Sequence, residues 1–170
     1  MGGTRNQDRE EYREFAEARA ARLFRIAYLM CGNWHEAEDL TQDTLTKLYV
    51  AWPKVRRAGN PDAYAHRTLM NAFLAHRRRK SAGELPVAEF RDAVVHEEDS
   101  ALRLSLLRAL RQLPPKGRAV VVLRYLEDHS VETVASVLGM SPSAVTTAGM
   151  RALAQLREIL GAGREHLFRS

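Results

Sequence analysis

The sequence has very little of what cross-linked or metal-caged folds require. Cys31 is the only cysteine among 170 residues, which excludes a disulfide framework and a cage of several thiolates. His35 lies four residues after Cys31, but two ligands do not make a metal site. A surface histidine beside a buried thiol explains the pair. We therefore expect no metal and no cofactor.

Long apolar runs are missing as well. No stretch approaches the length of a membrane span, and the first residues, Met-Gly-Gly-Thr-Arg-Asn, do not resemble a signal peptide. The sequence also lacks a glycine-rich phosphate loop, a nucleophile motif and carboxylates paired for acid–base chemistry. These absences predict a cytoplasmic protein without membrane insertion that is not an enzyme.

Charge is plentiful, and it comes in blocks. Residues 54–80 hold eight basic residues against Asp62 alone, and residues 101–170 hold ten basic residues against five acidic ones. Between them, residues 84–100 hold six acidic residues against Arg91. Two basic blocks separated by an acidic strip indicate two polyanion-binding units joined by a linker that avoids polyanions.

Apolar residues recur every three or four positions, and no alternating strand pattern is present. In the first half this period predicts helices at 8–31, 34–52 and 61–80, with Gly32 ending the first and Pro53 ending the second. The loop after Pro53 is expected to be turn-rich and basic. The inward-facing side chains of the second helix are expected to be Ala37, Leu40, Leu45, Leu48 and Tyr49.

The second half has the same period. It predicts helices at 99–112 and 115–127, a short helix before Gly139, and a last helix to residue 160 that Gly161 closes. The expected fold class is all-α, with two small helical domains joined by a flexible acidic linker. The expected boundaries are 8–80 for the first domain, 81–98 for the linker, 99–161 for the second domain and 162–170 for a short tail.

The stretch SVETVASVLGMSPSAV, residues 130–145, has the spacing of a helix-turn-helix. Ala135 lies four residues before Gly139, where two helices cross too closely for a large side chain, and Val145 lies six residues after it. Ser141 is a good N-cap, and Pro142 suits the first helical position. This pattern favours a DNA-binding helix-turn-helix over a plain helical hairpin, and its second helix would enter the major groove.

This stretch contains no lysine or arginine, which indicates that base contacts and phosphate contacts come from different parts of the domain. Base contacts specify a DNA sequence, while phosphate contacts position the protein on it. Short side chains at the start of the second helix are expected to face bases: Ser143, Ala144, Thr146 and Thr147. Three arginines on flanking helices are expected to grip phosphates: Arg118, Arg124 and Arg151.

These strings together resemble a known family. LPPKGRAVVVLRY and the helix-turn-helix after it are similar to region 4 of bacterial RNA polymerase sigma factors, in the small extracytoplasmic-function group. AEDLTQDTLTKLYVAW is similar to region 2.2, and NPDAYAHRTLMNAFLAHRRRK to regions 2.3 and 2.4. The resemblance covers residues 10–160 in the family's order. The Ala- and Arg-rich composition suggests an actinobacterial member.

The resemblance implies a partner protein and its contact residues. The family's Asp-Leu-x-Gln element docks on core RNA polymerase, and the matching positions here are Asp39, Leu40 and Gln42, with Asp43 adjoining. Side chains three or four residues apart share one helix face, which would present an acidic patch to a basic partner helix. The expected partners are thus core RNA polymerase and promoter DNA, with an anti-sigma factor left open.

The resemblance also assigns minus-ten DNA to the third helix and the loop 55–62 before it. Sigma factors melt this element by capturing an extruded base, which takes cationic groups for the backbone and a cradle for the base. The residues that match these roles are Arg56, Arg57, Asn60, Asn71, Arg77, Arg78 and Arg79. The second domain would recognise the minus-35 duplex.

The chain departs from the family pattern at several positions. Thr146 stands where many relatives have Lys, and the loss of that DNA contact would lower minus-35 affinity or shift the sequence preference. Thr133 stands where relatives often have Glu. Tyr64 replaces the common Trp, and Ala75 the common Asp. The alternative function is a stand-alone dimeric helix-turn-helix repressor or activator, which has no need for AEDLTQ or for a basic third helix.

Overall fold

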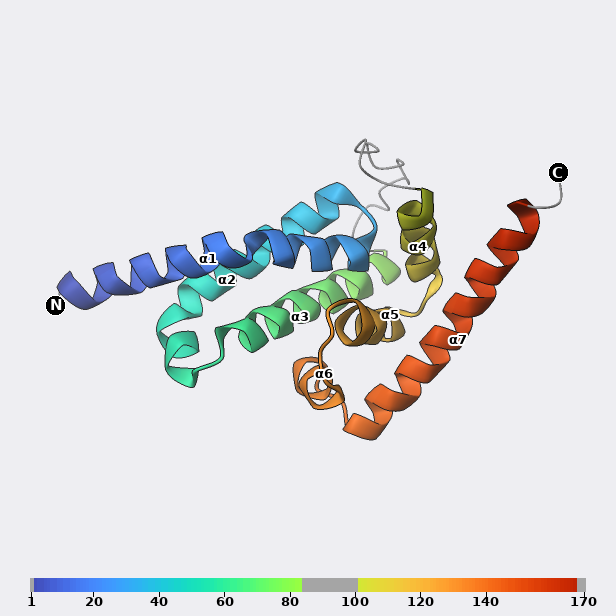
Figure 1. The fold of residues 1–170 in the computed structure, drawn as a ribbon. Coiled ribbons are helices and arrows are strands. Elements are labelled where there is room, and N and C mark those ends of the chain that lie inside the picture. The colour runs from blue at the N-terminus through green and yellow to red at the C-terminus, as the bar shows by residue number, and fades with distance from the viewer. Residues whose placement is uncertain (1, 84–100, 168–170) are drawn as a thin grey trace.

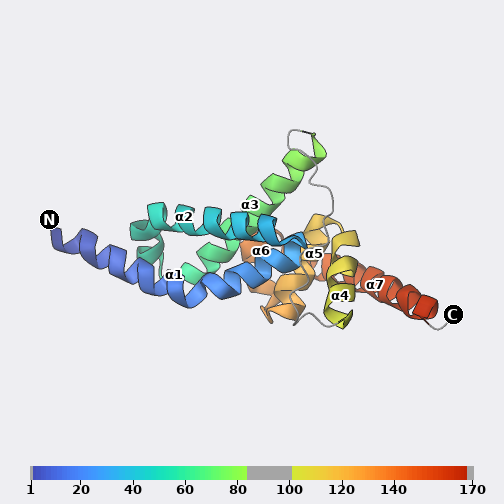
Figure 2. The same cartoon turned by 90° about the horizontal axis from the view of Figure 1, so that it is seen from above.

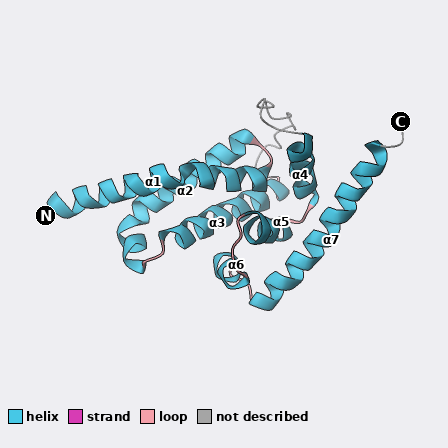
Figure 3. Cartoon of the chain, viewed as in Figure 1, coloured by secondary structure: helices cyan, strands magenta, loops and turns pink. Residues whose placement is uncertain are grey.

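The computed structural model describes residues 2–83 and 101–167 of the chain, with side chains placed as far as residue 162. Every regular element in these ranges is a helix, and none of the described residues forms a strand (Figure 3). The all-α class is therefore confirmed. The predicted acidic linker lies, from residue 84 onward, outside the described residues, and the proposed domain boundaries stay a prediction.

Three long helices form the first half: α1 (Gly2–Cys31), α2 (Trp34–Ala58) and α3 (Pro61–Ser81) (Figure 1). Gly32 ends α1 with a φ of +66°, as predicted, and the Asn33 side chain caps α2 by accepting from the Glu36 amide at 3.1 Å. Apolar side chains of all three helices are buried together in one core: Leu23, Ile26, Leu48, Val55, Leu69 and Phe73.

The prediction that Pro53 ends the second helix is wrong. α2 continues to Ala58 and ends at Gly59, whose φ is +80°. Proline inside a helix forfeits one backbone hydrogen bond and costs about 3 kcal/mol. Trp52 and Val55, on either side of Pro53, are both buried, so packing of this turn outweighs that cost. The expected loop shrinks to Gly59 and Asn60.

Two side chains expected in the core of α2 lie at its edge instead. Tyr49 is 49% exposed and Leu45 is half-buried, whereas Leu48 is fully buried. Tyr12 of α1 spans this edge: its hydroxyl donates to the Leu45 carbonyl at 2.6 Å, and its ring meets Tyr49 edge-on. α1 also starts at Gly2 instead of residue 8, and its first turns project beyond the other helices (Figure 1).

The second half contains α4 (Ala101–Gln112), α5 (Pro115–Val121), the π-helical turn η1 (Val122–Leu126), α6 (Val131–Leu138) and α7 (Pro142–Leu167). The helix predicted at 115–127 therefore changes its hydrogen-bonding period at Val122. Gly161 does not close the last helix, which continues to Leu167. One exposed glycine inside a helix costs only about 1 kcal/mol, too little to stop it.

The two halves pack against each other. α6 and α5 lie beside α3, and α4 lies beside the end of α1, in both views of the molecule (Figures 1 and 2). Buried residues of both halves, from Leu23 to Leu156, belong to one continuous core. The helix-turn-helix is therefore held at a defined position relative to α3.

Candidate nucleic-acid and protein interfaces

The structure builds the helix-turn-helix as its spacing predicts. Gly139 joins α6 to α7 with a φ of +64°, and Ala135 and Val145 are buried where the two helices meet. The Ser141 hydroxyl caps α7 by accepting from the Ala144 amide at 3.1 Å, and Pro142 is the first helical residue. The local predictions for this segment are confirmed.

The start of α7 presents a small, uncharged surface. Ser143, Thr146 and Thr147 are exposed, and Ala144 is half-buried. The Thr146 hydroxyl donates back to the Pro142 carbonyl at 3.1 Å, which leaves its methyl group and both oxygen lone pairs for a ligand. Short side chains of this kind suit close contact with base edges in a major groove.

The three arginines expected to grip phosphates differ in accessibility. Arg151 of α7 is exposed. Arg124 is half-buried, donates to the His129 carbonyl at 3.1 Å and lies over the Tyr125 ring. Arg118 is only 1% exposed, so its assignment as a phosphate contact is wrong for this arrangement of the chain.

Arg118 instead joins the ends of two helices. Its guanidinium donates to the carbonyls of Met30 at 2.5 Å and of Arg111 and Leu113 at 3.0 Å, and it lies over the Phe73 ring. The last carbonyls of a helix have no partner within that helix, and they carry partial negative charge that attracts a cation. Burial lowers the pKa of Arg118 to about 10, aided by the positive charge of Arg77.

The spacing of apolar residues around Arg118 could have predicted its burial. Val121 and Val122 lie three and four residues after Arg118 and are both buried, so Arg118 sits on the apolar face of its helix. An arginine on an apolar face needs buried acceptors. The sequence does not show that those acceptors come from helix ends as distant as Met30.

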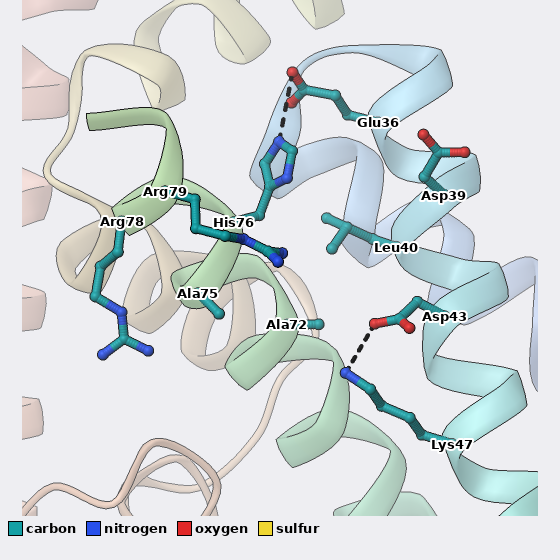
Figure 4. Close-up of a pocket in the computed structure, with 10 residues that line it drawn as sticks. All are labelled: Glu36, Asp39, Leu40, Asp43, Lys47, Ala72, Ala75, His76, Arg78 and Arg79. Atoms are coloured by element: carbon teal, nitrogen blue, oxygen red, sulfur yellow. Dashed lines mark ion pairs between the residues drawn. The ribbon is translucent and has the colours of Figure 1, made fainter. Parts of the chain in front are cut away.

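A groove of about 480 Å³ runs between α2 and α3 at the predicted polymerase-docking residues (Figure 4). Asp39 and Asp43 line the α2 side, and Ala72 and Ala75 form a floor of small side chains on α3. Figure 4 shows Arg79 reaching toward α2 while Arg78 points away from it. The groove thus has an acidic wall facing a basic one.

The docking residues are not equally accessible. Asp39, Gln42 and Asp43 are exposed, and Asp43 pairs with Lys47 at 2.9 Å. Leu40 is only 6% exposed and points toward α3 (Figure 4), so a partner would reach it only through the groove. Glu36 closes one end of the groove by accepting from Lys80 at 2.6 Å.

The residues expected at minus-ten DNA are spread over two surfaces. Arg78 and Arg79 at the end of α3 are exposed, and Arg77 is half-buried. Asn71 is exposed on α3 and lines a second groove, of about 500 Å³, with Val50 and Tyr64. These side chains are available to a ligand without rearrangement of the helices.

Three other residues of that set are already engaged within the chain. Arg56 forms ion pairs with Asp8 and, at 2.9 Å, with Glu11 of α1. Arg57 donates to a backbone carbonyl of its own helix and stays exposed. The Asn60 side chain caps α3 by accepting from a backbone amide, which occupies its carbonyl oxygen but leaves its amino group.

Sequence reasoning missed the polar groups between the halves. The Glu127 carboxylate is 2% exposed and accepts from Arg22 at 3.0 Å and from Arg25 at 3.2 Å. The His66 ring lies 5.0 Å from the ring of His129, edge to face. Burial, with His129 nearby, lowers the pKa of His66 to about 4. These partners lie tens of residues apart, and no local pattern joins them.

The residues considered as a metal pair lie apart from any ligand cluster. Cys31 is buried, as expected of a core thiol, and burial raises its pKa to about 12. His35 is exposed. Among residues 2–83 and 101–162, no group of three or more His, Cys, Asp or Glu side chains is placed to hold a metal ion. None of the described helices is long and apolar enough to cross a bilayer.

The two halves match two family models. Sigma-70 region 2 matches residues 15–83, and sigma-70 region 4 matches residues 103–156. The match to region 2 contains the α2–α3 groove, and the match to region 4 contains the helix-turn-helix. The order of the two regions is the one that the sequence motifs predict.

Curated relatives resemble the chain over most of its length. The RNA polymerase sigma-E factor of Streptomyces avermitilis is 36% identical over 152 residues, which cover 88% of this chain and 85% of the relative. The sigma-E factor of Streptomyces coelicolor is 34% identical over 152 residues, covering 88% and 86%. The ECF sigma factor SigW of Bacillus subtilis is 25% identical over 169 residues, covering 90% of each.

Two solved structures share the fold. The sigma factor RpoE of Bartonella quintana, solved with the anti-sigma factor NepR, has a TM-score of 0.76 and 21% identity, covering 89% of this chain and 98% of that one. CnrH, solved with the cytosolic domain of CnrY, has a TM-score of 0.69 and 22% identity, covering 91% and 90%. The region models and the sigma-factor relatives show that the chain belongs to the extracytoplasmic-function group of the sigma-70 family of RNA polymerase sigma factors.

Proposed function

We propose that the chain binds core RNA polymerase in the cytoplasm and directs it to promoters, where it recognises the minus-35 duplex and opens the minus-ten element. The observation that carries the proposal is the exposed, uncharged start of α7, presented on a helix-turn-helix in a chain of the sigma-70 family. Bond-forming chemistry belongs to the polymerase. An anti-sigma factor is a further expected partner.

For the minus-35 element, Thr146 and Thr147 contact base edges, while Arg151 and Arg124 contact phosphates. Arg118 is excluded from this set because it is buried. Replacing Thr146 and Thr147 by alanine should change which sequence is preferred, since their side chains read bases. Replacing Arg151 by alanine should weaken binding to all promoter sequences alike and reduce the salt dependence of binding. Competition between promoter variants for the assembled holoenzyme separates the two effects.

For the minus-ten element, Asn71 takes part in capturing the extruded base, and Arg78 and Arg79 follow backbone phosphates. Asn71→Ala should leave closed-complex binding nearly intact and impair opening, because base capture contributes only once the duplex has melted. A fluorescent base in the non-template strand reports opening, and a gel assay reports binding. Equal losses in both assays would show that α3 only holds duplex DNA.

For the polymerase, Asp39, Gln42 and Asp43 form the docking face, and the α2–α3 groove admits a partner side chain down to Leu40. Asp39→Arg should weaken assembly more than Gln42→Ala, because it turns attraction into repulsion at a complementary interface. Glu158→Arg is the matched control, since Glu158 is equally exposed but lies on α7. A competition assay against the parent chain for core polymerase measures the difference. Assembly of Asp39→Arg at the parent's level would refute the docking face.

A further inference from the structure

The α2–α3 groove is lined by charges of both signs in equal number. Its charged lining residues are three acids and three bases: Glu36, Asp39, Asp43, Lys47, Arg78 and Arg79. The formal charges of the lining therefore cancel. A polyanion such as DNA gains binding energy from a basic surface and gains little from a neutral one. This balance distinguishes the groove from a surface built for DNA.

Part of the charged lining is already paired within the chain. Asp43 pairs with Lys47 at 2.9 Å. Asp39 and Arg79 are exposed, and neither side chain forms an ion pair or a hydrogen bond among the residues that the structure describes. An acid of α2 and a base of α3 thus stay unpaired on the two walls of one groove.

The sequence of α3 explains why Arg79 has no partner in its own helix. Residues four apart lie on one face of a helix, and an acidic residue four positions before an arginine pairs with it. The residue four positions before Arg79 is Ala75, which carries no charge. Figure 4 shows the Arg79 side chain reaching toward α2, whereas the side chain of the neighbouring Arg78 points away from α2. The two arginines therefore have different surroundings.

The floor of the groove allows a partner to come close. Ala72 and Ala75 supply only methyl groups on the α3 side, and Leu40 of α2 is 6% exposed and points toward them (Figure 4). The side chains at a contact set how closely two helices approach, and small ones allow the closest approach. A helix lying on this floor would bring its own side chains between Asp39 and Arg79.

Such a groove disfavours any partner that carries charge of one sign. A uniformly basic segment is attracted by Asp39 and repelled by Arg79, and a phosphate backbone is attracted by Arg79 and repelled by Asp39. Interfaces use repulsion between like charges to reject wrong partners. A segment that carries a cation and an anion together satisfies both walls.

We propose that Arg79 belongs to the polymerase-docking site: a helix of core RNA polymerase lies in the α2–α3 groove and presents a cation to Asp39 and an anion to Arg79. The identity of this partner rests on the proposed function. The proposal refines that function at one residue, because Arg78 follows backbone phosphates and Arg79 does not. Charges of opposite sign on the two walls also fix the orientation of the bound helix.

The experiment compares two neighbouring arginines in the full-length chain. Arg79→Gln and Arg78→Gln each remove one positive charge from an exposed side chain, and circular dichroism checks that both variants are folded. A competition assay against the parent chain measures assembly with core polymerase. Fluorescence anisotropy with a labelled DNA duplex at low salt measures DNA binding by the free chain. Arg108→Gln, at an exposed arginine of α4, is the control for loss of one positive charge.

The two arginine variants should show opposite patterns. Arg79→Gln should weaken assembly about three- to tenfold, because an anion of the polymerase loses its counter-charge, and should leave duplex binding within about twofold of the parent. Arg78→Gln should weaken duplex binding and reduce its salt dependence, with assembly unchanged. Arg79→Glu should assemble less well than Arg79→Gln, because the anion is then repelled. Arg108→Gln should match the parent in both assays.

A second pair of variants tests whether Arg79 must be unpaired in the free chain. Ala75→Asp supplies a carboxylate four residues before Arg79, and Ala75→Asn fills the same space without a charge. The aspartate variant should assemble less well than the asparagine variant, because Arg79 then has a partner within α3. Equal assembly of the two variants would show that the floor senses size alone and would overturn the role of the Arg79 charge.

The outcomes separate this inference from the proposed function. Assembly of Arg79→Gln and Arg79→Glu at the parent's level would overturn the inference and leave the proposed function standing. Loss of duplex binding by Arg79→Gln without loss of assembly would return Arg79 to the phosphates. Failure of the parent chain to assemble with core polymerase would overturn both, since the groove would then have another occupant.

Discussion

Replacing Arg118 by methionine tests whether a single buried cation joins the ends of α1 and α4. Methionine has a similar length and no donors, so the variant keeps most of the packing and removes the hydrogen bonds to three backbone carbonyls. An acceptor left buried without a donor costs about 1–3 kcal/mol. Three such acceptors would therefore cost several kcal/mol if none were rehydrated.

Two features of Arg118 offset part of that loss. Its pKa is lowered to about 10 by burial, which shows that desolvation of the charge opposes folding. Its Nε is buried and has no hydrogen-bond partner. Removal of the guanidinium relieves both penalties, so we expect a net loss of about 2–3 kcal/mol in the free energy of unfolding. That is a large part of the 5–15 kcal/mol, roughly, that stabilises a typical protein.

Urea unfolding followed by circular dichroism measures this change, and Arg151→Met is the matched control on an exposed arginine. The control should stay within about 0.5 kcal/mol of the parent. Arg118→Met at the same stability as Arg151→Met would refute the reasoning, because the three carbonyls would then need no donor. Hydrogen exchange should show faster opening at the C-terminal turns of both α1 and α4, since Arg118 joins them.

Three further predictions follow from other sites. The pKa of His66 is about 4 in the folded chain, against 6.5 for an ordinary histidine. Between these two values the unfolded chain binds more protons than the folded chain, so the free energy of unfolding falls as the pH drops. About 2 kcal/mol should be lost between pH 8 and pH 5. The denaturation midpoint should depend less steeply on pH in His66→Gln than in the parent chain. In His35→Gln, at an exposed position, the midpoint should depend on pH as it does in the parent. Gly139→Ala should destabilise by about 1–2 kcal/mol, because its φ of +64° disfavours a Cβ although no neighbouring atom lies within 4 Å. Gly161→Ala, in the body of α7 and equally free of neighbours, should stabilise by about 0.5–1 kcal/mol in thermal unfolding.

Local features of the chain were predictable because short-range physics controls them. The caps at Asn33 and Ser141 and the glycine turns at Gly32 and Gly139 depend on hydrogen bonds and dihedral angles within a few residues. The exposed face of α7 follows from the helical period in the same way. Family membership was predictable too, because the motifs that carry it are continuous strings.

Two predicted helix ends were wrong because other contributions outweighed the preference of a single residue. Pro53 should end a helix, but burial of Trp52 and Val55 against the other helices carries α2 through it. Gly161 should also end a helix, and α7 nevertheless continues, because a single glycine costs less than the hydrogen bonds on either side of it contribute. In both places the sum over a helix exceeded the preference of one residue.

The sequence by itself determined the all-α class, the order of the two regions, the helix-turn-helix and the family, since each rests on residues close together in the chain. Only the tertiary structure decided that Arg118 is an internal cap instead of a phosphate contact, and that Arg56 is paired with Asp8 and Glu11. It also decided that Glu127 docks on α1. The physical reason is that the environment of a charge depends on which groups surround it in space, and those groups come from helices far apart in the sequence.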